Sequence, residues 1–169
     1  MPIGTSEVRR VLKKSWILFA AAVAVFLLWQ APARAANPNL SGEWKLNLAK
    51  SDYGKFPAPI SVTRKIDDDG LKLVSLTRQK GAQGEVTSKL TYTTDGKESV
   101  NEVAGAQAKG TAQWIGGMLI IESSREFQGA TLKQKEIWRL SPDGKVLTID
   151  SHVSIPNGEF DVKQVFDKQ

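Results

Sequence analysis

The 169-residue chain contains no cysteine and a single histidine, His152. Without cysteine, disulfides, thiolate nucleophiles, thiolate metal sites and lipid attachment through an N-terminal cysteine are excluded. One histidine excludes a histidine-based metal cage, and we expect neither a metal nor a cofactor. His152 also falls on the predicted outer face of its strand, which is not the dry site that a Ser-His-Asp triad needs. We therefore assign no catalytic residue, and an enzyme is the less favoured interpretation.

The formal charge of +5 would ordinarily suggest a nucleic-acid partner. Five of the 23 basic residues but only one of the 18 acidic residues lie in the first 35 positions. The remainder carries 18 basic and 17 acidic residues that interleave along the chain. A phosphate-binding surface needs Lys and Arg gathered on one face, so we expect no nucleic-acid partner.

The first 35 residues have the three-part plan of a secretory signal. Basic residues at positions 9, 10, 13 and 14 precede an apolar run from Trp16 to Trp29, and small residues at 33 and 35 suit signal peptidase. We predict cleavage between Ala35 and Ala36. The apolar run is too short for an anchor, because about 14 helical residues span about 21 Å against about 30 Å of hydrocarbon. Residues 36–169 are expected to form one periplasmic or secreted domain, exported by the general secretory or the twin-arginine route.

Apolar residues in 36–169 recur with period two, in short runs separated by turns rich in Gly, Pro and Asp. This pattern predicts an all-β fold, an antiparallel up-and-down meander of about 8–10 strands closed into a barrel. Residues 49–59 hold at most a turn of helix before Pro57 and Pro59. The candidate strands are 42–48, 60–66, 71–79, 85–94, 97–103, 107–115, 118–127, 130–140, 146–155 and 159–168.

Turn sequences predict the strand registers in the C-terminal half. The two-residue turns at 116–117 and 128–129 set Ser123 opposite both Gly110 and Gln134. The turn at 142–145 sets Glu136 opposite Ser151. A four-residue turn at 156–159 sets Ser151 opposite Gln164. Registers before residue 106 stay open, because the length of the turn at 95–96 decides whether residue 100 or 101 points inward.

Most positions on the predicted inner face are apolar, but six are polar: Ser123, Arg125, Gln134, Glu136, Ser151 and Gln164. Unsatisfied polar groups inside a barrel cost roughly 1–3 kcal/mol each, so these must bond one another, water or a ligand. The small residues 108 and 110 face Arg125 and Ser123, with Ala112 opposite Ile121, and small side chains opposite polar ones leave room. Two interpretations follow: a ligand cavity with Arg125 near one end, suited to an anionic head group, or a closed polar network in which Arg125 and Glu136 neutralise each other. Arg64 and Tyr92 join the cavity if their strands also close the barrel.

The first predicted strand contains Gly42-Glu43-Trp44, the G-x-W that opens the barrel in lipocalins and fatty-acid-binding proteins. The chain resembles these calycins, in which the Trp plugs the closed end. The resemblance implies that Arg125, Tyr92 and, more weakly, Arg64 would hold a ligand's head group. The opening residues 40–47 and Lys50-Ser51-Asp52 are also similar to secreted bacterial proteins described as lipocalin-like, which implies no activity.

Two functions stay open. The first is a monomeric binding protein, without a membrane anchor after cleavage, for a small amphipathic or hydrophobic molecule. The second is a structural or interaction protein of the cell envelope with a filled barrel. Asp67-Asp68-Asp69-Gly70 lacks the ligand spacing of a calcium loop, so we interpret it as a solvated hairpin turn.

Overall fold

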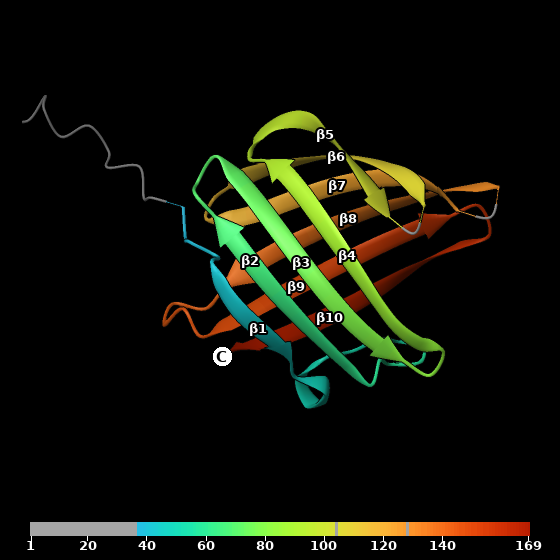
Figure 1. The fold of residues 1–169 in the computed structure, drawn as a ribbon, viewed down its shortest axis with the longest axis horizontal. Helices are drawn as coiled ribbons and strands as arrows, with labels where there is room; N and C mark the ends of the chain where they lie inside the picture. Colours follow the sequence, from blue (N-terminus) through green and yellow to red (C-terminus); the bar gives the residue numbers. More distant parts are fainter. Residues whose placement is uncertain (1–36, 104, 128) are drawn as a thin grey trace, which may run out of the picture. The chain divides into compact units, whose positions relative to one another are not determined.

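The computed structural model describes residues 37–103, 105–127 and 129–169, so the predicted signal peptide lies outside the described residues. The described chain is one antiparallel meander in the order β4-β3-β2-β1-β10-β9-β8-β7-β6-β5, which forms a nearly closed barrel (Figure 1). The predicted fold class is confirmed. The strands are β1 (Gly42–Leu46), β2 (Ser61–Asp68), β3 (Lys72–Gly81), β4 (Gly84–Thr93), β5 (Asp95–Val103), β6 (Ala106–Ile115), β7 (Met118–Phe127), β8 (Ala130–Leu140), β9 (Val146–Ile155) and β10 (Gly158–Lys168).

All ten predicted strands are present, with ends within two residues of those expected. A single 3-10 turn, η1 (Leu48–Lys50), lies between β1 and β2 and begins one residue before the stretch where a turn of helix was allowed. The Asn47 side chain caps it by accepting a hydrogen bond from the Lys50 amide. No helix in the described residues has the length and apolarity needed to cross a membrane.

The registers from β6 to β9 are confirmed, with Ser123 opposite both Gly110 and Gln134, and Glu136 opposite Ser151. The predicted β9–β10 register is wrong by two residues, since Ser151 faces Val162. The turn consists of only two residues, 156 and 157, and β10 begins at Gly158. Because a slip of two leaves every side chain on its face, the hydrophobic pattern could not detect the error.

The barrel closes between β4 and β5 through side chains rather than a main-chain ladder. The Asn101 amide accepts a hydrogen bond from the Thr91 N–H at 2.7 Å and donates one to the Thr91 carbonyl at 3.0 Å. The Ser99 hydroxyl accepts from the Thr93 N–H at 3.2 Å. Asn101 is half-buried whereas Val100 is 56% exposed, so the inward residue is Asn101.

One end of the barrel, here called the closed end, holds most of the buried core. Leu40 is fully buried there, and its carbonyl accepts a hydrogen bond from the Trp44 indole at 3.0 Å. The Asp68 carboxylate accepts the amides of Leu40 at 3.1 Å and Gly70 at 2.9 Å. Asp68 is therefore buried, and our interpretation of 67–70 as a wholly solvated turn is wrong at this residue. The core cluster is Leu40, Trp44, Leu46, Val62, Ile66, Leu73, Tyr92, Ala112, Leu119, Ile121, Trp138, Leu147, Ile149 and Phe166.

Candidate functional site

A carboxylate lies at the centre of the polar interior. Glu136 on β8 accepts hydrogen bonds from the Gln134 amide at 2.8 Å, the Trp138 indole at 3.0 Å and the Ser151 hydroxyl at 3.4 Å. The first two donors are on the same strand, two residues before and after Glu136, because every second side chain points inward. Ser151 comes from the paired position on β9. Three neutral donors thus satisfy the Glu136 carboxyl group.

An arginine lies inside the barrel next to this network. Arg64 on β2 places its guanidinium carbon 4.8 Å from the centre of the Trp138 ring and 5.3 Å from that of Phe166. Its Nε is buried and finds no hydrogen-bond partner in the described chain. Burial lowers the pKa of Arg64 and the negative charge of Glu136 raises it, without a hydrogen bond between them. Because arginine stays protonated in proteins, the interior holds a cation whose Nε–H can still donate.

Two tyrosines border this cation, and the charge that each would carry as a phenolate raises the pKa of Arg64. Tyr53, in the β1–β2 connection, accepts a hydrogen bond from the Gln164 amide at 3.0 Å. Burial raises the pKa of Tyr53. Burial, with the charge of Glu136, raises the pKa of Tyr92 to about 12. Both phenols are therefore neutral near pH 7 and keep their O–H as hydrogen-bond donors.

The sequence-predicted residues separate into two groups. Glu136, Gln134 and Ser151 form the hydrogen-bonded network, and Arg64 and Tyr92 are electrostatically coupled to it. Two others, Ser123 and Arg125, are half-buried on β7, and Arg125 pairs with Ala108 and Leu132 two residues from the end of the strand. Gln164 lies opposite Ile149 instead of in the predicted row with Glu136, and bonds a tyrosine from the connection.

Tyr53 is the site residue that our sequence interpretation missed. It is not in a strand, so period-two alternation does not apply to it. An isolated bridge holds its segment, in which Asp52 and Lys163 exchange two main-chain hydrogen bonds of 2.8 Å. No sequence signal marks that bridge. The only indication was that Tyr53 is one of two tyrosines in the chain.

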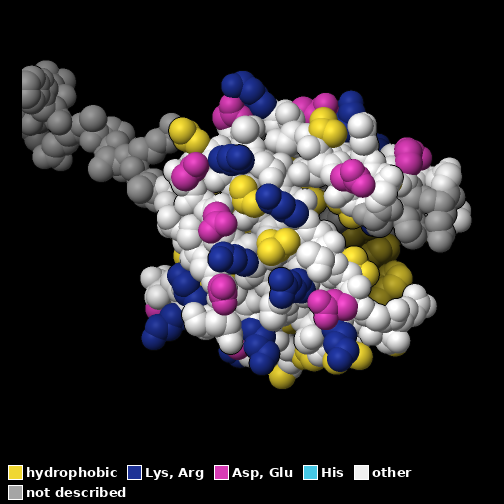
Figure 2. All heavy atoms as spheres, viewed as in Figure 1, with side chains coloured by type: hydrophobic (Ala, Val, Ile, Leu, Met, Phe, Trp, Pro, Cys, Tyr) yellow, Lys and Arg dark blue, Asp and Glu magenta, His cyan; other side chains and the backbone are white. Residues whose placement is uncertain are grey.

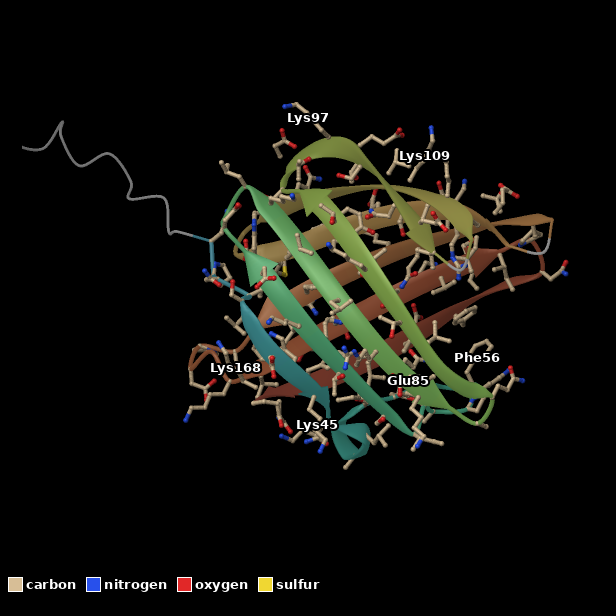
Figure 3. The ribbon with its side chains drawn as sticks, viewed as in Figure 1. Lys45, Phe56, Glu85, Lys97, Lys109 and Lys168 are labelled. Atoms are coloured by element: carbon tan, nitrogen blue, oxygen red, sulfur yellow. The ribbon has the colours of Figure 1, made fainter. Side chains whose placement is uncertain are left out.

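The end of the barrel opposite the closed end, here called the mouth, is edged by apolar side chains. The rings of Phe56 and Phe160 lie 4.3 Å apart, and Phe56 is 47% exposed. Val86 on β4 is 63% exposed although it occupies an inner-face position. Figure 2 shows a hollow lined by hydrophobic side chains on the right of the molecule, where Figure 3 labels Phe56. Between β1 and β2, only η1 and an irregular segment to residue 60 cross this end, so no pair of lid helices lies there.

The outer surface offers a second kind of concavity. A groove of about 480 Å³ lies over the outer faces of β5 to β9 and is lined in part by Lys109, Lys135 and His152. Its lysines are paired with neighbouring acids, Lys109 with Glu98 at 3.4 Å and Lys135 with Glu122 at 2.8 Å. These exposed, mutually neutralised charges contribute little recognition of a charged ligand. In the described residues, no group of three or more His, Cys, Asp or Glu could hold a metal ion.

Neither a protein-family model nor a curated protein sequence matches the chain. Solved structures do match. The zebrafish ileal bile acid-binding protein, complexed with cholic acid, aligns with a TM-score of 0.53 and 22% identity over 76% of this chain and 98% of that one. A secretory abundant heat soluble protein from Ramazzottius varieornatus aligns with a TM-score of 0.54 and 10% identity, over 79% of this chain and 98% of that one. A mutant of the fluorescent protein UnaG aligns with a TM-score of 0.52 and 13% identity, over 76% of this chain and 95% of that one.

These similarities concern the fold. At 10–22% identity they show that the chain shares a barrel architecture with proteins of the calycin type. The expected calycin-like barrel is thereby confirmed. The similarity to secreted bacterial lipocalin-like proteins stays a prediction.

Proposed function

We propose that this protein binds a small amphipathic molecule inside the barrel, with the apolar part towards the mouth and an anionic group at Arg64. The observation that carries the proposal is the Arg64 Nε–H, which is buried and makes no hydrogen bond in the described chain. A buried donor without an acceptor costs about 1–3 kcal/mol. A carboxylate or sulfonate supplies both the acceptor and the opposite charge, and guanidinium groups bind such anions well.

The surroundings of Arg64 support an acidic ligand over a neutral one. Glu136 is satisfied by Gln134, Trp138 and Ser151, so it need not pair with the arginine. The Tyr53 O–H can donate a hydrogen bond to a ligand oxygen, because the phenol oxygen already accepts one from Gln164. The sequence ranked Arg125 as the main head-group residue; we now propose Arg64 for that role, with Arg125 nearer the mouth.

The apolar side chains at the mouth support a ligand with a hydrophobic body. Phe56, Phe160 and Val86 would contact it, and each buried methylene contributes about 0.8 kcal/mol. Cholic acid, which the zebrafish protein holds in its crystal structure, combines an apolar face with a carboxylate and is a suitable probe.

A competition experiment tests the head-group assignment. The protein is loaded with the fluorescent anion 1-anilinonaphthalene-8-sulfonate, which is then displaced with dodecanoate, dodecanol or cholate. We expect dodecanoate to bind at least about tenfold more tightly than dodecanol, because a charge-assisted hydrogen bond contributes about 1.5–3 kcal/mol. Arg64→Gln should remove that preference. The matched control Arg78→Gln, on the exposed outer face of β3, should retain it.

The outcomes distinguish the two functions. Equal affinity for dodecanoate and dodecanol, or a preference that survives Arg64→Gln, would show that Arg64 is not the head-group residue. Failure of every probe to bind would instead favour the filled barrel, with the outer groove as the functional surface.

We further propose that the protein binds its ligand outside the cytoplasm, in the periplasm or the medium. The support is the signal-like segment 1–35 alone. Expression of the full chain in a bacterium, followed by intact mass measurement of the periplasmic fraction, should find a chain that begins at Ala36. Recovery of the uncleaved chain from the membrane fraction would contradict this.

A further inference from the structure

The β4 strand has main-chain groups that its neighbours leave unused. Consecutive residues of a strand point their N–H and C=O to opposite sides. In β4, Thr91 and Thr93 point theirs away from β3, since they bond side chains of β5. By the same alternation Glu85, Thr87 and Lys89 point their main chain away from β3. We call the main-chain groups of these three residues the free edge.

No described residue bonds to the free edge. Asn101 and Ser99 reach only the Thr91–Thr93 end of β4. In Figure 1 the β3–β4 turn end of β4 lies well away from β5. Glu85, Thr87 and Lys89 are all exposed, and Figure 3 labels Glu85 near that turn. An exposed strand with unpaired donors and acceptors can pair with a strand from another chain.

We propose that the partner of the free edge is the same strand of a second copy of this protein. Antiparallel pairing with Thr87 opposite Thr87 of the second copy places Glu85 opposite Lys89 of the second copy, and Lys89 opposite its Glu85. All three pairs then belong to the type that exchanges two main-chain hydrogen bonds. The opposite charges meet twice, and cross-strand pairs of opposite charge stabilise a sheet.

The charges select this register and this partner. A shift of one residue would place a residue whose N–H and C=O point to the free edge opposite one whose groups point back to β3, so the pair could not exchange hydrogen bonds. A shift of two residues would place each charged side chain opposite a neutral residue. The pairing also brings Val86, 63% exposed in a single chain, against a second strand. The contact is small, so the dimer is weak and concentration-dependent. It replaces our sequence-based expectation of a monomer and does not depend on the ligand proposal.

Sedimentation velocity over a wide range of protein concentration tests the pairing, with protein expressed from the full chain. We expect reversible dimerisation. Lys89→Glu or Glu85→Lys places like charges opposite each other and should weaken association about tenfold. The double variant Glu85→Lys with Lys89→Glu restores opposite charges and should recover association to within about threefold. Lys65→Glu, on the exposed face of β2, is the control for altered net charge.

A second variant tests the main chain directly. Thr87→Pro removes the central N–H of the free edge but no hydrogen bond to β3, so it should abolish dimerisation. Its fold is checked by circular dichroism; if it does not fold, the charge-swap series decides. A protein that stays monomeric at all concentrations, or a dimer unaffected by both Thr87→Pro and Lys89→Glu, would overturn the proposal.

Discussion

The Trp138 indole contacts two opposite charges of the barrel interior, Arg64 and Glu136. Its ring centre lies 4.8 Å from the Arg64 guanidinium carbon, and its N–H donates to Glu136 at 3.0 Å. The electron-rich face of an aromatic ring attracts a cation, whereas an indole N–H donates to an anion. One side chain therefore stabilises a cation and a carboxylate that make no hydrogen bond to each other. The arrangement leaves the Arg64 Nε–H without an acceptor in the described chain.

If Arg64 binds a ligand's anionic group, as proposed, it should lower the stability of the ligand-free protein. Arg64→Met removes a half-buried charge and an unpartnered buried Nε while retaining volume, and such replacements are often stabilising. The lost cation–π contact offsets part of the gain. We expect the free energy of unfolding of the ligand-free protein to rise by about 1 kcal/mol in urea unfolding followed by tryptophan fluorescence. A fall of similar size would mean that Arg64 has a structural role.

Gly110 allows β6 to pack closely against Tyr92 and β7. A methyl group on Gly110 would lie 2.8 Å from the Glu122 carbonyl oxygen, 2.9 Å from the Ser123 Cβ and 3.1 Å from the Tyr92 ring. Because two of these atoms belong to the paired strand, the backbone must shift. We expect Gly110→Ala to lower the free energy of unfolding by about 2–3 kcal/mol. Gly81→Ala is the matched control, since no atom lies within 4 Å of its added methyl, and it should change little. Equal effects of the two would contradict the close packing.

The alternation of apolar and polar residues predicted which side chains point inward better than it predicted which residues pair across neighbouring strands. Glu136 and Ser151 were paired correctly because the turn between their strands has a clear signature. The pairing of Ser151 with Gln164 was wrong because a two-residue slip costs no burial, and only the length of the turn distinguishes the registers.

The sequence predicted most of the inward-facing polar residues, but not that Arg64 rather than Arg125 contacts Trp138. Arg64 was considered weaker than Arg125 because turn signals covered only the C-terminal half. What singles out Arg64 is its contact with Trp138 across the interior, which depends on how the barrel closes. The β1–β2 connection brings Tyr53 to the site, and loop packing leaves no periodic trace.

His152 should titrate above its ordinary range. Its Nδ1 lies 2.8 Å from an Asp161 oxygen and its Nε2 3.6 Å from a Glu159 oxygen. The hydrogen bond to Asp161 raises the pKa of His152 above 6.5, with a smaller contribution from the charge of Glu159. A raised pKa means that the charged form stabilises the fold below pH 6.5, and that this stabilisation is lost as the pH rises through the folded-state value.

NMR titration of His152 can measure this pKa without ambiguity, because the chain has one histidine. Asp161→Asn should lower the pKa more than Glu159→Gln does. The same order should appear in the loss of stability between pH 6 and 8. An unchanged pKa in Asp161→Asn would show that the hydrogen bond does not form in solution.

The Asp68 side chain binds the segment before β1 at the closed end, so removing it should destabilise that end of the barrel. Its carboxylate accepts hydrogen bonds from the Leu40 and Gly70 amides, and the Leu40 carbonyl accepts one from the Trp44 indole N–H. Asp68→Ala leaves the buried Leu40 amide without an acceptor, which should cost about 2–3 kcal/mol of the free energy of unfolding.

Asp67→Ala, one residue earlier and exposed, is the control for Asp68→Ala and should stay within about 0.5 kcal/mol of the parent. Hydrogen exchange separates local from global loosening: the Leu40 amide should exchange faster in Asp68→Ala even where strands β7 to β9 keep their protection. If both variants lose equal stability, Asp68 acts through the charge of the turn rather than through Leu40. If only Asp68→Ala does, the buried carboxylate holds the N-terminal segment that carries Trp44 into the core.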